Sequence, residues 1–320
     1  MNAINKRMNW LDWMKAIGMY LIVYGHFTSY GHKFIYIFSV PLFFVISGFL
    51  FKHEVGIGNF LKKNFYNLIV PMLIMVALVQ LRQKLPLVLN GTFDISQIWQ
   101  IITGILIGNQ KIIGACWFIY TLFIVKFFLC VLPDNRYIRF TLFILFSVAS
   151  MIFSHKGIFA QNAIVNVLLS YPFFYFGTIL RKYKTVINEG FNTRYSVLMF
   201  FITLLITYMC SIYNGHVWVY INDYGNNFLL YLVGGFSGTA LIYIISKWLD
   251  KIESSIVSTI SIGSIIILGL HFSFIRYMKI RPELDFVSAF ILLLLFVPII
   301  RFCERRLPIL IGIYRTNKSK

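Results

Sequence analysis

The 320-residue sequence is poor in charge and lacks the motifs of the common soluble enzymes. Asp, Glu, Lys and Arg make up 12% of it, whereas soluble domains carry about 25%. It has no P-loop, no dinucleotide-binding glycine fingerprint, no His-Glu-x-x-His and no Gly-x-Ser-x-Gly, which excludes the simplest ATPase, metalloprotease and hydrolase assignments. Its four cysteines have no paired spacing, so we expect no disulfide framework, no metal site and no bound cofactor.

Long apolar runs are the dominant feature that is present. Hydrophobic residues make up 59% of the chain, and the mean hydropathy is +0.77. In lipid a chain must satisfy its backbone polar groups internally, and runs of about 20 residues select helices rather than a barrel. The sequence therefore predicts an all-α polytopic membrane protein with about ten transmembrane helices, at residues 10–28, 34–52, 65–83, 113–132, 137–153, 163–181, 195–213, 228–246, 256–276 and 284–302.

The chain has no stretch long enough to form a separate soluble domain. We expect residues 1–320 to form one membrane domain with short cytoplasmic tails at 1–9 and 304–320. The apolar segment 98–107 is too short to cross a bilayer, and it predicts an interfacial or re-entrant piece.

The formal net charge of +18 follows the pattern of membrane topology. With the N-terminus inside, Lys and Arg in the cytoplasmic segments outnumber those on the opposite side by more than two to one. This predicts a multi-pass protein of the plasma (inner) membrane with both termini in the cytoplasm. The partner of the basic excess is then the anionic lipid of the bilayer, and no nucleic acid is expected.

Lys15 and His26 are ionisable residues within the first apolar segment, where a charged group costs roughly 2.5–3.5 kcal/mol on insertion scales. Eleven helical steps bring them to one face about 16 Å apart, and Asp12 lies near enough to pair with Lys15. Histidine is the usual general base at neutral pH, and the lysine suits an anionic ligand entering from the cytoplasm. The simpler alternatives are an interfacial histidine and a lysine that snorkels towards headgroups.

Four further residues are candidates for substrate binding, each with a plainer structural alternative. Trp117 offers a platform for a sugar, or belongs to the aromatic belt at the membrane surface. His271 is expected at the same depth as His26, which suggests a shared site. Ser47 provides a hydroxyl, or only close helix packing. Lys63 suits a nucleotide phosphate, although the topology rule requires basic residues there in any case.

These segments together resemble the acyltransferase-3 family of polytopic membrane acyltransferases, within it the enzymes that O-acetylate or O-succinylate surface polysaccharides. The resemblance covers most of the chain, and the matching segments occur in the family's order. They are Asp12-x-x-Lys15 followed by His26, Pro41-Leu-Phe-Phe-Val-Ile-Ser47-Gly48, Trp117-Phe-Ile-Tyr-Thr-Leu122, and Gly263-Ser264 through to His271.

The resemblance implies a membrane O-acyltransferase that moves an acyl group, most simply acetyl from acetyl-CoA, to a hydroxyl of a cell-envelope polysaccharide or its lipid-linked precursor. His26 is then the expected general base, with Lys15 and Asp12 as the other catalytic residues. Acyl-CoA, a cell-surface glycan and proteins of polysaccharide biosynthesis or export are the expected partners. Two other classes stay open: a flippase or transporter, and a non-catalytic membrane subunit for glycan export.

Overall fold

The structure is a computed structural model that describes residues 7–27, 30–52, 56–155, 162–189, 191, 193–279 and 281–313. It is 83% helical, which confirms the all-α prediction. Within these ranges the β-structure is limited to two isolated bridges, one between Asn109 and Asn162 and one between Trp218 and Asp223.

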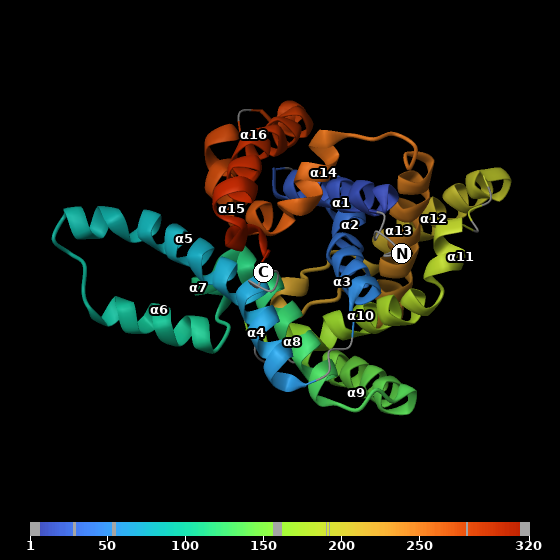
Figure 1. Cartoon of the computed structure of the whole chain (residues 1–320), viewed down its shortest axis with the longest axis horizontal. Helices are drawn as coiled ribbons and strands as arrows, with labels where there is room; N and C mark the ends of the chain where they lie inside the picture. The colour runs from blue at the N-terminus through green and yellow to red at the C-terminus, as the bar shows by residue number, and fades with distance from the viewer. Residues whose placement is uncertain are drawn as a thin grey trace, which may run out of the picture.

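Sixteen α-helices follow one another along the described chain (Figure 1). They are α1 (Asn9–Phe27), α2 (His32–Tyr36), α3 (Ser39–Leu50), α4 (Ile57–Asn64), α5 (Val70–Leu89), α6 (Ser96–Leu106), α7 (Gln110–Ile113), α8 (Trp117–Val131), α9 (Arg136–His155), α10 (Asn166–Lys182), α11 (Lys184–Glu189), α12 (Thr193–Asn214), α13 (Phe228–Trp248), α14 (Ser255–Ile262), α15 (Ser264–Met278) and α16 (Asp285–Arg306). Short helices of other types are the π-helix η1 (Phe65–Ile69) and the 3-10 helices η2 (Gly114–Cys116), η3 (Val219–Ile221), η4 (Pro282–Leu284) and η5 (Pro308–Ile311).

Side-chain caps determine where two of these helices begin. Asn227 Oδ1 accepts hydrogen bonds from the backbone amides of Leu229 and Leu230, at 2.8 and 3.1 Å, at the start of α13. Ser254 Oγ accepts one from the amide of Val257, at 3.3 Å, at the start of α14. Each cap satisfies amides that have no partner within the helix, so the chain turns into both helices at defined residues.

Seven helical stretches of the described chain are long and apolar enough to cross a membrane, or eight if the bent pair α14–α15 forms one span. The ten expected segments are all helical, but ten spans are not confirmed. α1 is not apolar enough to count as a membrane span, because polar residues, among them Asp12, Lys15 and His26, interrupt its apolar run. α10 is too short to count as a membrane span, because it has only 17 residues. The cytoplasmic location of both termini stays a prediction.

The ninth expected span is a broken helix. α14 and α15 meet at an angle of 85° at Gly263. A β-carbon at Gly263 would lie 2.3 Å from the side chain of Ile300, so only glycine lets α16 approach the bend this closely. The bend directs α14 and α15 to different parts of α1, which both of them contact.

The third expected span is longer than the predicted range 65–83. α4, η1 and α5 form one helical stretch of 33 residues, Ile57–Leu89. After α5 the chain reverses direction and continues as α6, and the two helices project from the bundle as a hairpin (Figure 1). The sequence-based boundary fell short because Arg82 and Lys84 interrupt the apolar run while the helix continues. α6 corresponds to the segment expected at the interface, and it exposes Trp99.

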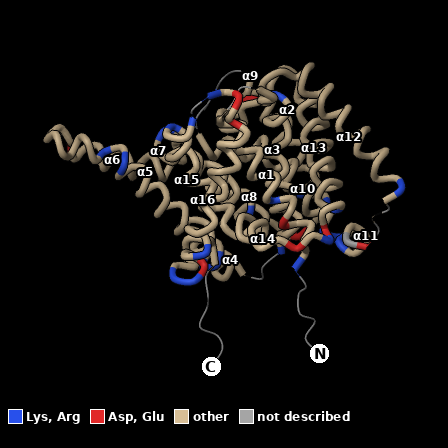
Figure 2. The backbone as a smooth tube through the Cα atoms, turned by 90° about the horizontal axis from the view of Figure 1, so that it is seen from above, with Lys and Arg blue, Asp and Glu red and all other residues tan. Residues whose placement is uncertain are grey.

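Charged residues gather at the two ends of the helices and leave a band with few charges between them (Figure 2). This distribution suits a bilayer, where only the helix ends meet water and headgroups. Together with the long apolar helices it supports a multi-pass membrane protein. At the C-terminal end of the described chain, α16 is followed by η5, which packs on α5 and α15.

α3 and α10 pack more closely than any side chain would allow at their crossing. A β-carbon on Gly48 would lie 2.0 Å from the carbonyl oxygen of Phe174, and one on Gly177 would lie 2.2 Å from that of Val45. The two glycines therefore bring the backbones of the helices into direct contact, which is how small residues stabilise helix pairs in membranes.

We predict that Gly48→Ala and Gly177→Ala each destabilise the protein by about 1–3 kcal/mol, because the new methyl group meets backbone atoms that cannot rotate away. Thermal unfolding of the purified protein in detergent measures the effect. Gly58→Ala in α4 is the matched control, since its β-carbon meets nothing within 4 Å. An unchanged unfolding temperature in both crossing variants would contradict the close packing of α3 and α10.

Candidate functional site

Polar contacts join the first turn of α1 to α14. Ser261 Oγ donates a hydrogen bond to Asp12 Oδ1 at 2.6 Å, and the guanidinium of Arg7 pairs with the other carboxylate oxygen. Arg7 also donates to the carbonyl of Ser258 at 3.0 Å. Asp12 is buried, and a buried carboxylate is costly unless donors surround it. These contacts therefore satisfy Asp12 and anchor α1 on the broken helix.

Lys15 is close enough to Asp12 to interact with it electrostatically, although another cation forms the salt bridge to this carboxylate. Within the described chain the ion-pair partner of Asp12 is Arg7, which reaches the carboxylate from the residues that precede α1. Lys15 is half-buried on α1 and does not line the cavity that contains His26. The three residues predicted from the spacing on α1 thus lie in two places. Asp12 and Lys15 lie near the N-terminal end of the helix, where Asp12 attaches it to α14, and His26 lines the cavity near the C-terminal end.

His26 lies beside His271 of α15 at the other end of α1. The centroids of the two imidazole rings are 5.1 Å apart, and the ring planes are tilted by 30°. Phe272 contacts both rings, with centroid distances of 4.3 Å to His26 and 4.6 Å to His271. The structure thus brings together two histidines that are separated by most of the sequence.

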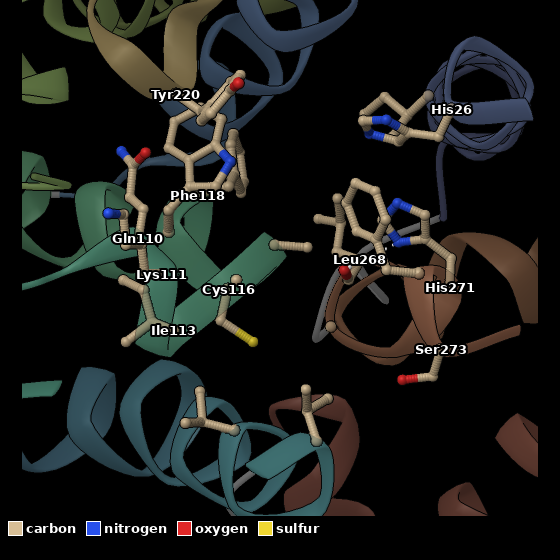
Figure 3. A pocket seen from close by; sticks show the side chains of 18 of the residues that line it. His26, Gln110, Lys111, Ile113, Cys116, Phe118, Tyr220, Leu268, His271 and Ser273 are labelled. Carbon is tan, nitrogen blue, oxygen red and sulfur yellow. Dashed lines mark hydrogen bonds between the residues drawn. The ribbon is translucent and has the colours of Figure 1, made fainter. Parts of the chain in front are cut away.

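Backbone contacts fix the tautomer of His271. Its Nδ1 lies 2.8 Å from the carbonyl oxygen of Ile267 and 3.0 Å from that of Leu268. Carbonyl oxygens only accept hydrogen bonds, so Nδ1 must carry the proton. The neutral ring then has a bare lone pair on Nε2, and this buried atom has no hydrogen-bond partner within the described chain. His271 therefore presents an acceptor to the cavity (Figure 3).

Tyr36 of α2 holds His26 in a similar way. Its hydroxyl oxygen lies 2.8 Å from Nδ1 of His26, and the hydroxyl donates to the carbonyl of Gly25 at 3.1 Å. A hydroxyl has one proton, so while Tyr36 donates to Gly25 it accepts the Nδ1 proton of His26. Nε2 of His26 is then the free acceptor. Gly25 is required here, because a β-carbon would lie 2.5 Å from the Tyr36 ring.

The two histidines line a cavity of about 710 Å³ between α1, α5, α7, α8, α15 and the loop before α13. Figure 3 shows His26 and His271 on one side of this cavity and Gln110, Phe118 and Tyr220 on the other. A volume of 300–1,000 Å³ is typical of small-molecule sites. The cavity can therefore hold a ligand between an apolar wall and two proton acceptors.

Of the other candidate residues from the sequence, Trp117 lines this cavity, whereas Ser47 and Lys63 do not. Ser47 is half-buried on α3 beside the glycine of the α3–α10 crossing. Lys63 is exposed on α4. Figure 2 shows α4, the helix that carries Lys63, near one charged edge of the bundle and α7 closer to the other.

The sequence analysis missed Tyr36, Gln110, Trp218 and Tyr220. A signal existed only for the aromatic pair, because Trp218 and Tyr220 lie two residues apart in a short connection between apolar segments. Gln110 has no sequence signal, since a lone glutamine near a helix start is ordinary. Tyr36 could have been found only from the packing of α2 on α1, which brings residues 26 and 36 together.

No group of three or more potential metal ligands occurs among the described residues. A second hollow of about 550 Å³ lies near the other end of α1, where Trp10, Leu11 and Met14 line it. Its lining is apolar apart from hydroxyl groups and contains no histidine. Proton-transfer chemistry is therefore best placed in the cavity of His26 and His271, where two neutral imidazoles can accept a proton from a hydroxyl.

Residues 8–303, nearly the whole chain, match the family model described as an acyltransferase domain, acyltransferase-3. No curated protein and no solved structure matches the chain.

We predict that Lys111 at the cavity and Lys62 on α4 face opposite sides of the membrane, because α7 and α4 lie at opposite ends of the helices. In a background with the native cysteines replaced by alanine, Lys111→Cys should react with a membrane-impermeant thiol reagent added to intact cells. Lys62→Cys should react only after permeabilisation. Both residues are exposed, so labelling of both from outside would contradict the predicted orientation.

Proposed function

The chain belongs to the acyltransferase-3 family and is a membrane acyltransferase, and from this premise we propose that it transfers an acyl group from acyl-CoA to a hydroxyl of a cell-envelope glycan. The observation that supports the proposal is the pair His26 and His271 on the wall of the cavity, where the centroids of their imidazole rings are 5.1 Å apart. An imidazole held in one orientation with a free nitrogen is suited to take a proton from a hydroxyl.

His26 acts as the general base in the proposed reaction. The acceptor hydroxyl oxygen attacks the thioester carbonyl carbon while Nε2 of His26 takes the hydroxyl proton. The carbon–sulfur bond then breaks, and the leaving thiolate of coenzyme A receives this proton from the imidazolium. The products are an O-acyl ester and coenzyme A with a free thiol, and His26 is neutral again. The Tyr36 hydroxyl orients the ring throughout, at 2.8 Å from Nδ1.

His271 binds the acceptor rather than exchanging a proton. Its Nδ1 proton is engaged by two backbone carbonyls, so the ring is held firmly and Nε2 is directed to the ligand. A hydroxyl of the acceptor donates to this nitrogen, which satisfies a buried atom that otherwise has no partner in the described chain. The reacting hydroxyl is thereby positioned beside His26.

Lys15 and Lys63 interact with the donor in this proposal. Lys15 precedes His26 by eleven residues on α1, about 16 Å along the helix, and its ammonium suits the negative charge of coenzyme A. Asp12, held by Arg7 and Ser261, fixes the helical turn that carries Lys15. Lys63 is exposed on α4 and suits a nucleotide phosphate at the membrane surface. Ser47 does not line the cavity and has no role in the proposed reaction.

The finer identity of the reaction is part of the proposal. Acetyl is the simplest acyl group, with acetyl-CoA as donor and the plasma (inner) membrane as the location. Three aromatic side chains of the cavity, Trp117, Trp218 and Tyr220, favour a sugar as acceptor, because aromatic faces stack on the apolar faces of sugar rings. An acceptor of this kind makes proteins of polysaccharide biosynthesis or export the natural partners.

We predict that His26→Gln lowers acyl transfer at least about 100-fold, because a positioned general base typically contributes that much. Alkali-released acyl groups on the surface glycan are measured in cells lacking the protein and in cells re-expressing the wild type, His26→Gln or Gln100→Ala. Gln100 is exposed on α6 and does not line the main cavity, so its variant should restore acylation. Equal acylation in all four strains, with normal glycan amounts, would instead favour a transporter or a scaffold.

Tyr36→Phe should lower kcat about tenfold and leave both KM values unchanged, because Tyr36 acts only through the orientation of His26. A double-mutant cycle tests this role. Tyr36→Phe should cause no further loss in a His26→Gln background, whereas a general loss of folding would reduce the double variant by the same factor again. An additive effect would show that Tyr36 does not act through His26.

A further inference from the structure

We propose that Gln110 is the specificity-determining residue of an acceptor subsite, where its side-chain amide hydrogen-bonds two neighbouring hydroxyls of a sugar ring. This inference rests on the proposed function and extends it to the chemistry of the acceptor. Four features carry it: the unpaired amide, the rigid segment that holds it, the two indole rings near His26, and the basic side chains of the cavity.

The amide of Gln110 is buried but has no hydrogen-bond partner in the part of the chain that the structure describes. The residue is 7% exposed, and both Nε2 and Oε1 are buried without a partner in the described chain. Leaving a buried polar group unpaired is expensive, so such a group calls for a ligand or a water. Gln110 lines the cavity, and Figure 3 shows it across from His26 and His271. Gln110 therefore forms part of the wall of the volume in which the substrate reacts.

The backbone around Gln110 is tightly held, in contrast to its side chain. The buried Gln80 donates from Nε2 to the carbonyl of Ile112 at 2.8 Å. The Tyr120 hydroxyl donates to the carbonyl of Leu106 at 2.7 Å. The amide of Ala163 donates to the carbonyl of Gly108 at 2.8 Å. Contacts from three different segments thus fix the chain on both sides of Gln110, so the backbone that carries its side chain has a defined position beside the cavity.

Two indole rings bring the subsite close to the general base. Trp117, Trp218 and His26 all line the main cavity and also a small recess of about 70 Å³ that adjoins it. Trp218 is held by paired backbone hydrogen bonds with Asp223, at 2.8 and 3.1 Å, and by its contact with the ring of His32 at 4.7 Å. A sugar ring that contacts these indoles thus lies near Nε2 of His26.

Amide chemistry matches a polyhydroxylated ring. The carbonyl oxygen of glutamine accepts hydrogen bonds and its NH₂ group donates them, so one side chain can pair with two adjacent hydroxyls. Arg82 and Lys111 also line the cavity and are exposed, which adds positive charge near its mouth. The chemistry therefore favours a sugar ring, with room at the mouth for an anionic part of the glycan chain.

The experiment measures steady-state kinetics of the full-length protein in detergent. Acetyl-CoA is the donor, and the acceptor is oligosaccharide cut from the surface glycan of cells that lack the protein, after base treatment to remove esters. Gln110→Met keeps the length of the side chain but removes its hydrogen bonds. It should raise the acceptor KM about 10- to 100-fold and leave the acetyl-CoA KM unchanged.

Gln100→Met on the exposed face of α6 is the matched control and should behave as the wild type. If Gln110→Met is unstable, Gln110→Glu serves as the second variant, because it keeps the shape of the side chain but loses the NH₂ donors. It should also raise the acceptor KM. An unchanged acceptor KM in a folded variant, or an increase in the acetyl-CoA KM instead, would overturn the subsite.

A binding titration separates this inference from the proposed function. The same oligosaccharide should quench tryptophan fluorescence of the wild type in a saturable manner, with the half-saturation concentration raised about 10-fold or more in Gln110→Met. If the wild type transfers no acetyl group but shows this quenching and its shift, the proposed function fails and the subsite stands. Absent quenching, or equal half-saturation in both proteins, overturns the subsite.

Discussion

The attachment of α1 to the broken helix α14–α15 is the constraint on which the site depends. Ser261 of α14 binds Asp12 at the start of α1, and His271 of α15 lies beside His26 at its end. One straight helix crosses another at a single point, but the 85° bend at Gly263 lets the pair contact α1 at both ends. The position of His26 relative to His271 is therefore fixed by contacts at the far end of α1 as well as by their own packing.

Hydrogen bonding within an apolar environment explains which groups are available for chemistry. A bilayer offers no water to buried polar groups, so most of them are satisfied within the protein. Asp12 receives two donors, and Nδ1 of His271 meets two carbonyls. By contrast, Nε2 of His271 and the amide of Gln110 are buried without partners among the described residues, and both side chains line the same cavity. The polar groups that remain available for hydrogen bonds to a substrate thus belong to residues of the cavity wall.

The sequence predicted the positions of the helices well, but it predicted only some of the contacts between them. Apolar length located all ten helical segments, but it could not show the bend at Gly263 or the continuation of α5 past Lys84. Helical spacing singled out His26 and membrane depth singled out His271, because each signal is contained in one segment. The hydrogen bond from Ser261 to Asp12 was not predictable, since the two residues are 249 positions apart. Gln110 and Trp218 reach the cavity, and Tyr36 reaches the small recess beside it, only through packing between segments.

The size of the cavity limits how the two substrates of the proposed reaction can meet. A volume of about 710 Å³ is that of a site for one small molecule, too small for a whole coenzyme together with several sugar units. Only the reacting ends, a thioester and one sugar ring, can share it. The nucleotide of the donor and the rest of the glycan must then extend from it in different directions. Arg82 and Lys111 at the cavity suit the emerging glycan, while Lys15 nearer the N-terminal end of α1 suits the donor. In the proposed reaction the membrane helices can thus join two large substrates, because each presents only its reacting end to His26.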